Sequence, residues 1–147
     1  AENIHSPSNV GLIVRTCESF GVKRLIFSGP FSNTSSERFR KAARSAEKYL
    51  DIATHDHTVS VIQGLVIQGF KVVALEITDK SRKLSNFQLT EDEKIAILIG
   101  SERHGVNAVS LKLSNHSIHI EQYGKTGSLN VGTALAIALY EFTKQME

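Results

Sequence analysis

The chain has 147 residues, of which 41% are hydrophobic and 22% are charged, and it carries a formal net charge of +2. This length and composition predict a single globular domain over residues 1–147, with enough apolar material for a core and no room for a second domain. The longest apolar runs are too short to span a bilayer, and no basic-then-apolar segment opens the chain, so we expect a soluble, cytoplasmic protein. The small positive charge permits a nucleic-acid partner without requiring one.

Cysteine and histidine usage argues against a metal centre. Cys17 is the single cysteine, which excludes an internal disulfide framework and a cysteine metal cluster. It lies on the apolar face of a predicted helix, so we expect it to be buried by packing rather than to act as a nucleophile. His55, Asp56 and His57 alternate as metal ligands can, but no further ligand run accompanies them, and we expect no metal.

The first part of the chain predicts a helix followed by a strand. Residues 6–8 resemble a helix start, apolar residues then recur at helical spacing up to Phe20, and Gly21 provides a C-terminal cap. We expect a strand over Arg24–Gly29. Residues 37–50 then predict a helical or partly helical surface segment with few large apolar residues.

The middle of the chain repeats this alternation. We expect a helix over Thr58–Gln68 and a nearly continuous apolar strand over Phe70–Leu75. Ile95–Gly100 is the most apolar strand, for which we expect a central parallel position covered on both faces. A short strand follows over Ser117–Ile120.

The last predicted element is a helix over Val131–Phe142. A glycine-containing loop precedes it, and Ser128 stands where we expect the helix N-cap. The helix is apolar nearly all round, which is typical of a helix covered on more than one side, and a partner subunit is a candidate for the second cover. Together the elements predict an α/β fold with a parallel sheet flanked by helices.

The run from Gly100 to Gly105 (GSERHG) leaves the most apolar strand through a glycine and at once presents the carboxylate of Glu102. Ligands in open α/β sheets bind beyond the carboxyl ends of the strands, so this placement suits a binding site. It is not a Walker loop, because Val106 and Asn107 follow where Lys and Ser or Thr are required. The chain also has no Gly-x-Gly-x-x-Gly dinucleotide motif.

Three segments, in order, resemble the motifs of the SpoU (TrmH-like) RNA 2′-O-ribose methyltransferases of the SPOUT superfamily. The first motif corresponds to Asn9, Gly11, Arg15-Thr16-Cys17 and Phe20-Gly21, and the second to Gly100-Ser101-Glu102 with Gly105. The third corresponds to Ile120-Glu121-Gln122, Gly124 and Ser128-Leu129-Asn130-Val131. It departs from the family at Glu121 and Gln122, where Pro and Met are usual.

The resemblance implies helices on both faces of a parallel sheet, a deep trefoil knot in the C-terminal half, and S-adenosylmethionine held by the knotted loops. The implied cofactor contacts are Leu75, Glu76, Gly100, Ile120, Ser128 and Leu129. Ile120 and Leu129 are expected to form apolar walls, while backbone groups read the adenine edge. We expect that a side chain at Gly100 would invade the adenosine pocket.

The implied activity is methyl transfer to a ribose 2′-hydroxyl of tRNA or rRNA, by a homodimer. The implied catalytic residues are Arg15, Asn9, Glu102, Ser128 and Asn130. The family assigns activation of the hydroxyl to Arg15, although a guanidinium with a pKa above about 12 is almost never neutral at pH 7. Stabilising the forming alkoxide or gripping the adjacent phosphate is chemically easier, and the sequence leaves the choice open.

A group of basic residues suggests where RNA binds: Arg38, Arg40, Lys41 and Arg44. Lys41, Arg44 and Lys48 lie at helical spacing, so a helix here would present a basic ridge, either as a solvated face or as a phosphate contact. Two other functions stay open. One is a catalytically inactive protein of the same fold that binds the cofactor and RNA, and the other is a flavodoxin-like nucleotide-binding domain that acts as an interaction module.

Overall fold

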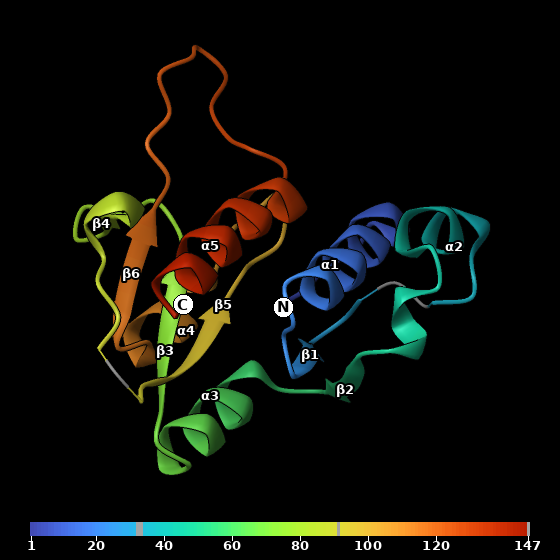
Figure 1. Ribbon diagram of the computed structural model, residues 1–147, viewed down its shortest axis with the longest axis horizontal. Coiled ribbons are helices and arrows are strands. Elements are labelled where there is room, and N and C mark those ends of the chain that lie inside the picture. Colours follow the sequence, from blue (N-terminus) through green and yellow to red (C-terminus); the bar gives the residue numbers. More distant parts are fainter. Residues whose placement is uncertain (32–33, 91, 147) are drawn as a thin grey trace.

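The computed structural model describes residues 1–31, 34–90 and 92–146 (Figure 1). The helices and strands are α1 (Pro7–Ser19), β1 (Arg24–Ser28), α2 (Glu37–Ala43), β2 (Asp51–His55), α3 (Thr58–Ile67), β3 (Phe70–Leu75), β4 (Arg82–Lys83), β5 (Lys94–Leu98), α4 (Ala108–Leu113), β6 (His116–His119) and α5 (Val131–Gln145), with 3₁₀ turns η1 (Ala46–Lys48) and η2 (Leu84–Asn86). The seven elements predicted outside residues 37–50 are confirmed to within three residues at each end. The short elements β2, β4 and α4 were not predicted.

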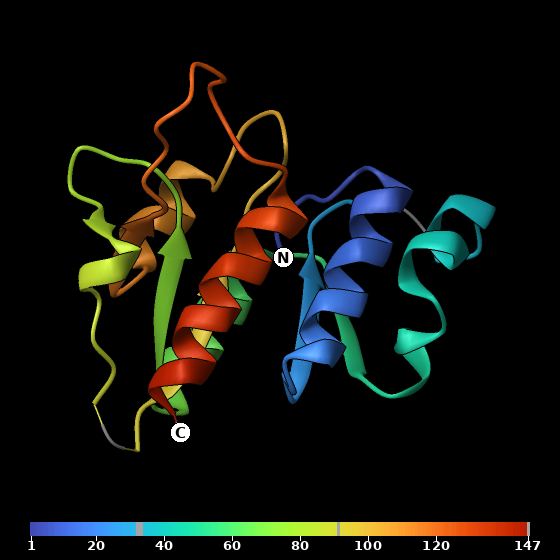
Figure 2. The same cartoon turned by 45° about the horizontal axis from the view of Figure 1, so that its top comes forward.

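The strands form two parallel sheets, one of order β1-β2 and one of order β4-β6-β3-β5. Helices α1 and α5 lie side by side in both Figure 1 and Figure 2. The chain therefore has the predicted α/β architecture of parallel strands flanked by helices.

Strand β3 runs between β6 and β5, and its side chains alternate between two helical layers. Val72 and Ala74 pack in one apolar cluster with Ile62 of α3. Val73, which lies between them in sequence, packs on the opposite face with Phe142 of α5. Both faces of the larger sheet are thus covered by helices, as the resemblance implies.

The expected central position of the most apolar strand is wrong, because β5 is an outer strand of its sheet and the interior strands are β6 and β3. Ile95 and Ile97 of β5 are only partly buried. Beyond β5, the amide of Glu2 donates to the carbonyl of Ile99 at 2.9 Å, and the amide of Asn3 donates to the carbonyl of Ser28 at 2.9 Å. The amino-terminal residues therefore join the two sheets at the end of β5.

The predicted basic ridge is not continuous, because α2 ends at Ala43. Arg44 and Ser45 have φ values of 49° and 65°, in the left-handed region that ends a helix. Lys41 and Lys48 consequently belong to different elements. The helix itself is fixed by a close crossing with α1, where a Cβ on Gly11 would lie 2.7 Å from the carbonyl oxygen of Phe39.

Helix α5 starts at Val131 as predicted, but its N-cap is Asn130, two residues later than expected. The side chain of Asn130, not that of Ser128, accepts from the amides of Gly132 and Thr133 at 2.9 and 3.3 Å. One side of the helix is buried, but on the other Ile137 is 39% and Tyr140 is 60% exposed. Within this chain, α5 is therefore covered on one side only.

Cys17 is buried in the core between α1 and β1, as predicted, with 3% of its surface exposed. Burial disfavours the thiolate and raises the pKa of the Cys17 thiol to about 11. Among the described residues, no three His, Cys, Asp or Glu side chains are grouped so as to hold a metal ion. The described part of the chain also contains no helix that is both long enough and apolar enough to cross a membrane.

Candidate active site

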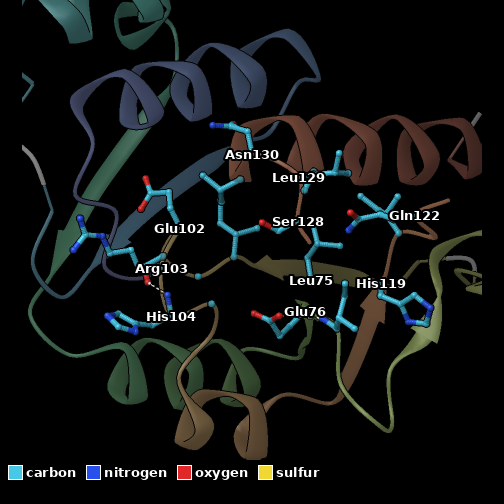
Figure 3. Close-up of a pocket in the computed structure, with 18 residues that line it drawn as sticks. Leu75, Glu76, Glu102, Arg103, His104, His119, Gln122, Ser128, Leu129 and Asn130 are labelled. Atoms are coloured by element: carbon cyan, nitrogen blue, oxygen red, sulfur yellow. Dashed lines mark hydrogen bonds between the residues drawn. The ribbon is translucent and has the colours of Figure 1, made fainter. Parts of the chain in front are cut away.

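A cavity of about 520 Å³ lies where β3, β5 and β6 end (Figure 3). Four segments line it: the end of β3, the loop that follows β5, the end of β6, and the approach to α5. Because the strands are parallel, their carboxyl ends meet at one edge of the sheet, which is where open α/β folds bind ligands. The segment between β6 and α5 extends away from the body of the molecule (Figure 1), and residues 122–130 are exposed.

All six residues expected to contact the cofactor line this cavity: Leu75, Glu76, Gly100, Ile120, Ser128 and Leu129. The reason expected for Gly100 is wrong, however. A Cβ there would lie 2.0 Å from the carbonyl carbon of Gly105 and 2.2 Å from the amide nitrogen of Val106. A side chain at this position would strike the protein's own loop rather than a bound ligand.

The loop after β5 is held rigidly from both sides. Ser101 and Gly105 exchange backbone hydrogen bonds of 3.2 and 2.9 Å, and the Ser101 hydroxyl accepts from the amide of His104 at 3.1 Å. From the end of β3, Oε2 of Glu76 accepts from the amide of Val106 at 2.9 Å. The Glu76 carboxylate thus shapes the cavity by fixing this loop.

Three predicted catalytic residues from distant parts of the chain form one hydrogen-bonded chain. Nδ2 of Asn9, on α1, donates to Oε1 of Glu102 at 2.5 Å. Nδ2 of Asn130 donates to Oδ1 of Asn9 at 2.9 Å. We call this chain the amide relay.

The direction of the amide relay is set by α5. Oδ1 of Asn130 is committed to the first amides of the helix, so its Nδ2 must face Asn9. The Asn9 amide must then present Oδ1 to Asn130 and Nδ2 to Glu102. The relay therefore offers Glu102 a donor, which suits an ionised carboxylate.

The other two predicted catalytic residues are placed differently. Ser128 lines the cavity and is exposed. Arg15 is exposed on α1, lies outside the cavity, and makes no hydrogen bond or ion pair with the described residues. It is six residues beyond Asn9, or about 9 Å further along the helix axis.

A sequence profile of the SpoU rRNA Methylase family matches residues 1–140. The chain belongs to this family. Its membership excludes the flavodoxin-like interaction module and agrees with the order of the three motifs around the cavity.

Individual relatives match the chain over nearly its whole length. A tRNA (guanosine(18)-2′-O)-methyltransferase of Mus musculus is 31% identical over 99% of this chain, which covers 9% of that protein. The enzyme of the same name from Thermus thermophilus is 29% identical over 98% of this chain, which covers 72% of it.

Solved structures of this family share the fold. The A. aeolicus TrmH/SpoU tRNA modifying enzyme superimposes with a TM-score of 0.86 at 26% identity, covering 98% of this chain and 72% of that one. The AdoMet-bound rRNA methyltransferase of Sinorhizobium meliloti gives a TM-score of 0.91 at 23% identity, covering 99% of this chain and 55% of that one. The parallel α/β arrangement is thus that of SpoU enzymes.

Further residues line the cavity that the sequence analysis did not assign to the site, among them Arg103, His104, His119 and Gln122. The first two occupy the variable positions of the second SpoU motif, so their place in the motif was an available signal. His119 gave none. Nδ1 of His119 lies 2.9 Å from the Ser81 hydroxyl, which also lies 2.8 Å from the carbonyl oxygen of Thr78.

The predicted RNA-binding residues lie apart from the cavity. Helix α2 packs on the side of α1 that faces away from α5 (Figures 1 and 2). All four side chains are exposed: Arg38, Arg40, Lys41 and Arg44. Two of them have partners, since Arg40 donates to the carbonyl of Ser35 at 2.7 Å and Lys41 pairs with Glu37 at 2.9 Å.

Proposed function

We propose that this protein transfers the methyl group of S-adenosylmethionine to a ribose 2′-hydroxyl of structured RNA, either tRNA or rRNA. The observation that carries the proposal is the meeting of Asn9, Glu102 and Asn130 beside a cavity lined by all six expected cofactor positions. Relatives from Mus musculus and Thermus thermophilus are named tRNA (guanosine(18)-2′-O)-methyltransferases, so a guanosine of tRNA is the first acceptor to test.

The cavity fits S-adenosylmethionine in size and lining. Its volume of about 520 Å³ suits a ligand of that size, and Leu75, Ile120 and Leu129 give it apolar walls. When bound, the cofactor supplies an electrophilic methyl group on a sulfonium. The loop fixed by Glu76 and the end of β6 would hold the adenosine between them.

Glu102 is the residue we assign to the acceptor ribose. One of its carboxylate oxygens accepts from Asn9, while Oε2 makes no hydrogen bond within the described residues. That oxygen is free to accept from a ribose hydroxyl and to hold it in line with the methyl group. Alignment of two reactants in this way lowers the barrier to methyl transfer by several kcal/mol.

We assign Arg15 to the stabilisation of negative charge rather than to proton abstraction, because a guanidinium does not act as a base near neutral pH. Its position outside the cavity agrees with a contact to a phosphate or to the developing alkoxide from the acceptor side. Ser128 lines the cavity close to Asn130 in sequence and would orient the cofactor or the ribose.

We further propose a homodimer formed through α1 and α5. The open side of α5 carries Ile137 and Tyr140, which are 39% and 60% exposed, beside a second hollow of about 270 Å³. Arg15 follows Leu12 by one helical turn, and Leu12 is the residue of α1 that packs on Gly132 of α5. A second copy on this face would therefore cover the apolar side chains and enclose Arg15. Light scattering that shows a monomer at micromolar concentration would contradict the proposal.

The family resemblance also leads us to propose that residues 1–147 form one catalytic domain with a trefoil knot in its C-terminal half. The interior position of β6, between β4 and β3, supports this, since the segment after it leaves from inside the sheet. Pulling the unfolded chain by its two ends should give a contour length shorter than that of an unknotted chain. The tRNA substrates named for the bacterial relatives support a cytoplasmic location.

The central experiment is incubation with labelled S-adenosylmethionine and either bulk tRNA or bulk rRNA. We expect methyl incorporation into one of them, on a ribose 2′-oxygen. Cofactor binding without incorporation into either RNA would favour the catalytically inactive alternative, which the intact amide relay disfavours.

A further inference from the structure

The described residues that line the cavity include one cationic Lys or Arg side chain, that of Arg103. It is exposed, and its guanidinium makes no hydrogen bond or ion pair with the described residues. The neighbouring carboxylate of Glu102 accepts from Asn9 and forms no ion pair with Arg103. A permanently charged fork of donors is therefore left without an acceptor at the rim of the cavity.

The loop presents this arginine in a fixed place. Backbone hydrogen bonds between Ser101 and Gly105 close the loop around it, and Glu76 anchors the loop's end through the amide of Val106. A side chain on a rigid loop loses less conformational entropy on binding than one on a mobile segment. Arg103 thus has the properties of a prepared anion contact.

The direction of the side chain identifies the anion. In Figure 3 the Arg103 side chain extends outward, away from Ser128 and Leu129, whereas Glu102 extends toward α1. The exposed guanidinium therefore faces away from the interior that we assign to the cofactor, and we assign it to the RNA. Its planar fork matches two oxygens of a phosphate.

We propose that Arg103 binds the phosphodiester adjacent to the acceptor ribose and so sets the ribose against Glu102. This inference rests on the proposed function, since it requires RNA to approach this cavity. The basic residues of α2 do not substitute for it, because they lie on the far side of α1. Arg103 is thus assigned the phosphate contact at the reacting nucleotide, and α2 a more distant part of the RNA.

The test compares Arg103→Ala and Arg103→Lys with a matched surface control, Lys23→Ala. Lys23 is exposed just before β1, at the amino ends of the strands and so at the opposite edge from the cavity. For each protein, binding of bulk tRNA is measured across a salt series, S-adenosylmethionine binding by calorimetry, and folding by circular dichroism.

Arg103→Ala is expected to weaken tRNA binding by about tenfold and to reduce the slope of log affinity against log salt by about one. Arg103→Lys should keep the slope but not the full affinity, since lysine retains the charge without the fork. S-adenosylmethionine affinity should not change in either variant, and Lys23→Ala should match the wild type in every measurement.

Two results would overturn the assignment while leaving the proposed function intact. One is tRNA binding by Arg103→Ala that equals the wild type, and the other is a loss of S-adenosylmethionine affinity, which would place the guanidinium on the cofactor carboxylate. Wild-type protein that binds neither tRNA nor rRNA would overturn the proposed function together with this inference.

Discussion

Replacing Asn130 with aspartate separates its two roles at the start of α5. Aspartate is as good an N-cap as asparagine, and its charge is favourable at a helix N-terminus, so the amides of Gly132 and Thr133 keep their acceptor. The new carboxylate has no donor for Oδ1 of Asn9, which now accepts at 2.9 Å. The Asn9 amide must turn over, and its oxygen then faces Glu102.

The expected cost falls on activity rather than on folding. The variant loses a charge-assisted hydrogen bond to Glu102 at a partly exposed place, for which we estimate about 1 to 2 kcal/mol, or a five- to thirtyfold slower transfer. In the free energy of unfolding this loss is offset by the hydrogen bond that Nδ2 of the turned Asn9 amide donates to the new carboxylate, so the variant should stay within about 0.5 kcal/mol of the wild type. Asn130→Ala, which also removes the cap, should lose about 1 kcal/mol of stability in addition.

Single-turnover methylation and urea denaturation measure the two quantities separately. Adding Glu102→Gln to Asn130→Asp supplies a donor opposite the turned Asn9 amide, so the two changes should show favourable coupling in stability. Unchanged transfer by Asn130→Asp would refute the argument that the orientation of the relay matters. A loss of stability equal to that of Asn130→Ala would refute the assignment of the cap.

Three further changes test other parts of the structure. Gly100→Ala should destabilise the fold by about 1 to 3 kcal/mol and abolish cofactor binding, because its Cβ would lie within 2.2 Å of the backbone at Gly105 and Val106; denaturation and calorimetry check this, and normal stability would contradict it. Arg15→Ala should abolish methyl transfer with cofactor affinity nearly unchanged; a retained rate, or an affinity that falls with it, would show that the residue has another role. The pKa of Cys17 is raised from 9.0 to about 11 in the fold, so its stabilising effect is complete below pH 9 and is lost as the pH rises through 11. Unfolding at pH 10.5 should therefore show a loss of about 2 kcal/mol that is missing in Cys17→Ala, and equal losses in the two proteins would contradict burial of the thiol as the cause.

Local sequence patterns were sufficient to predict many of the helices and strands of this structure. The Ser6 cap and the helical spacing of apolar residues predict α1, and an unbroken apolar run predicts β3. In both cases the signal lies within one short segment of the sequence. Residues 37–50 were harder to predict, since the helix stops where Arg44 turns left-handed, and no glycine marks that point. Strand β2 is exposed at three of its five positions and gave no periodic pattern.

The order of the three motifs was also readable, and the six residues expected to contact the cofactor line the cavity. Motif order did not reveal how these residues meet. Asn9 lies 93 residues from Glu102 and 121 from Asn130, so their contacts depend on the packing of α1 beside α5 and on the loop after β5.

The sequence by itself thus determined the longer helices and strands, the parallel α/β class and the family motifs, because each depends on neighbouring residues or on short spacings. Tertiary structure decided which asparagine caps α5, why Gly100 must lack a side chain, and that Arg15 lies outside the cavity while Arg103 stands at its rim. These depend on the distances and directions between segments, which are fixed when the sheet, its covering helices and the connecting loops pack together.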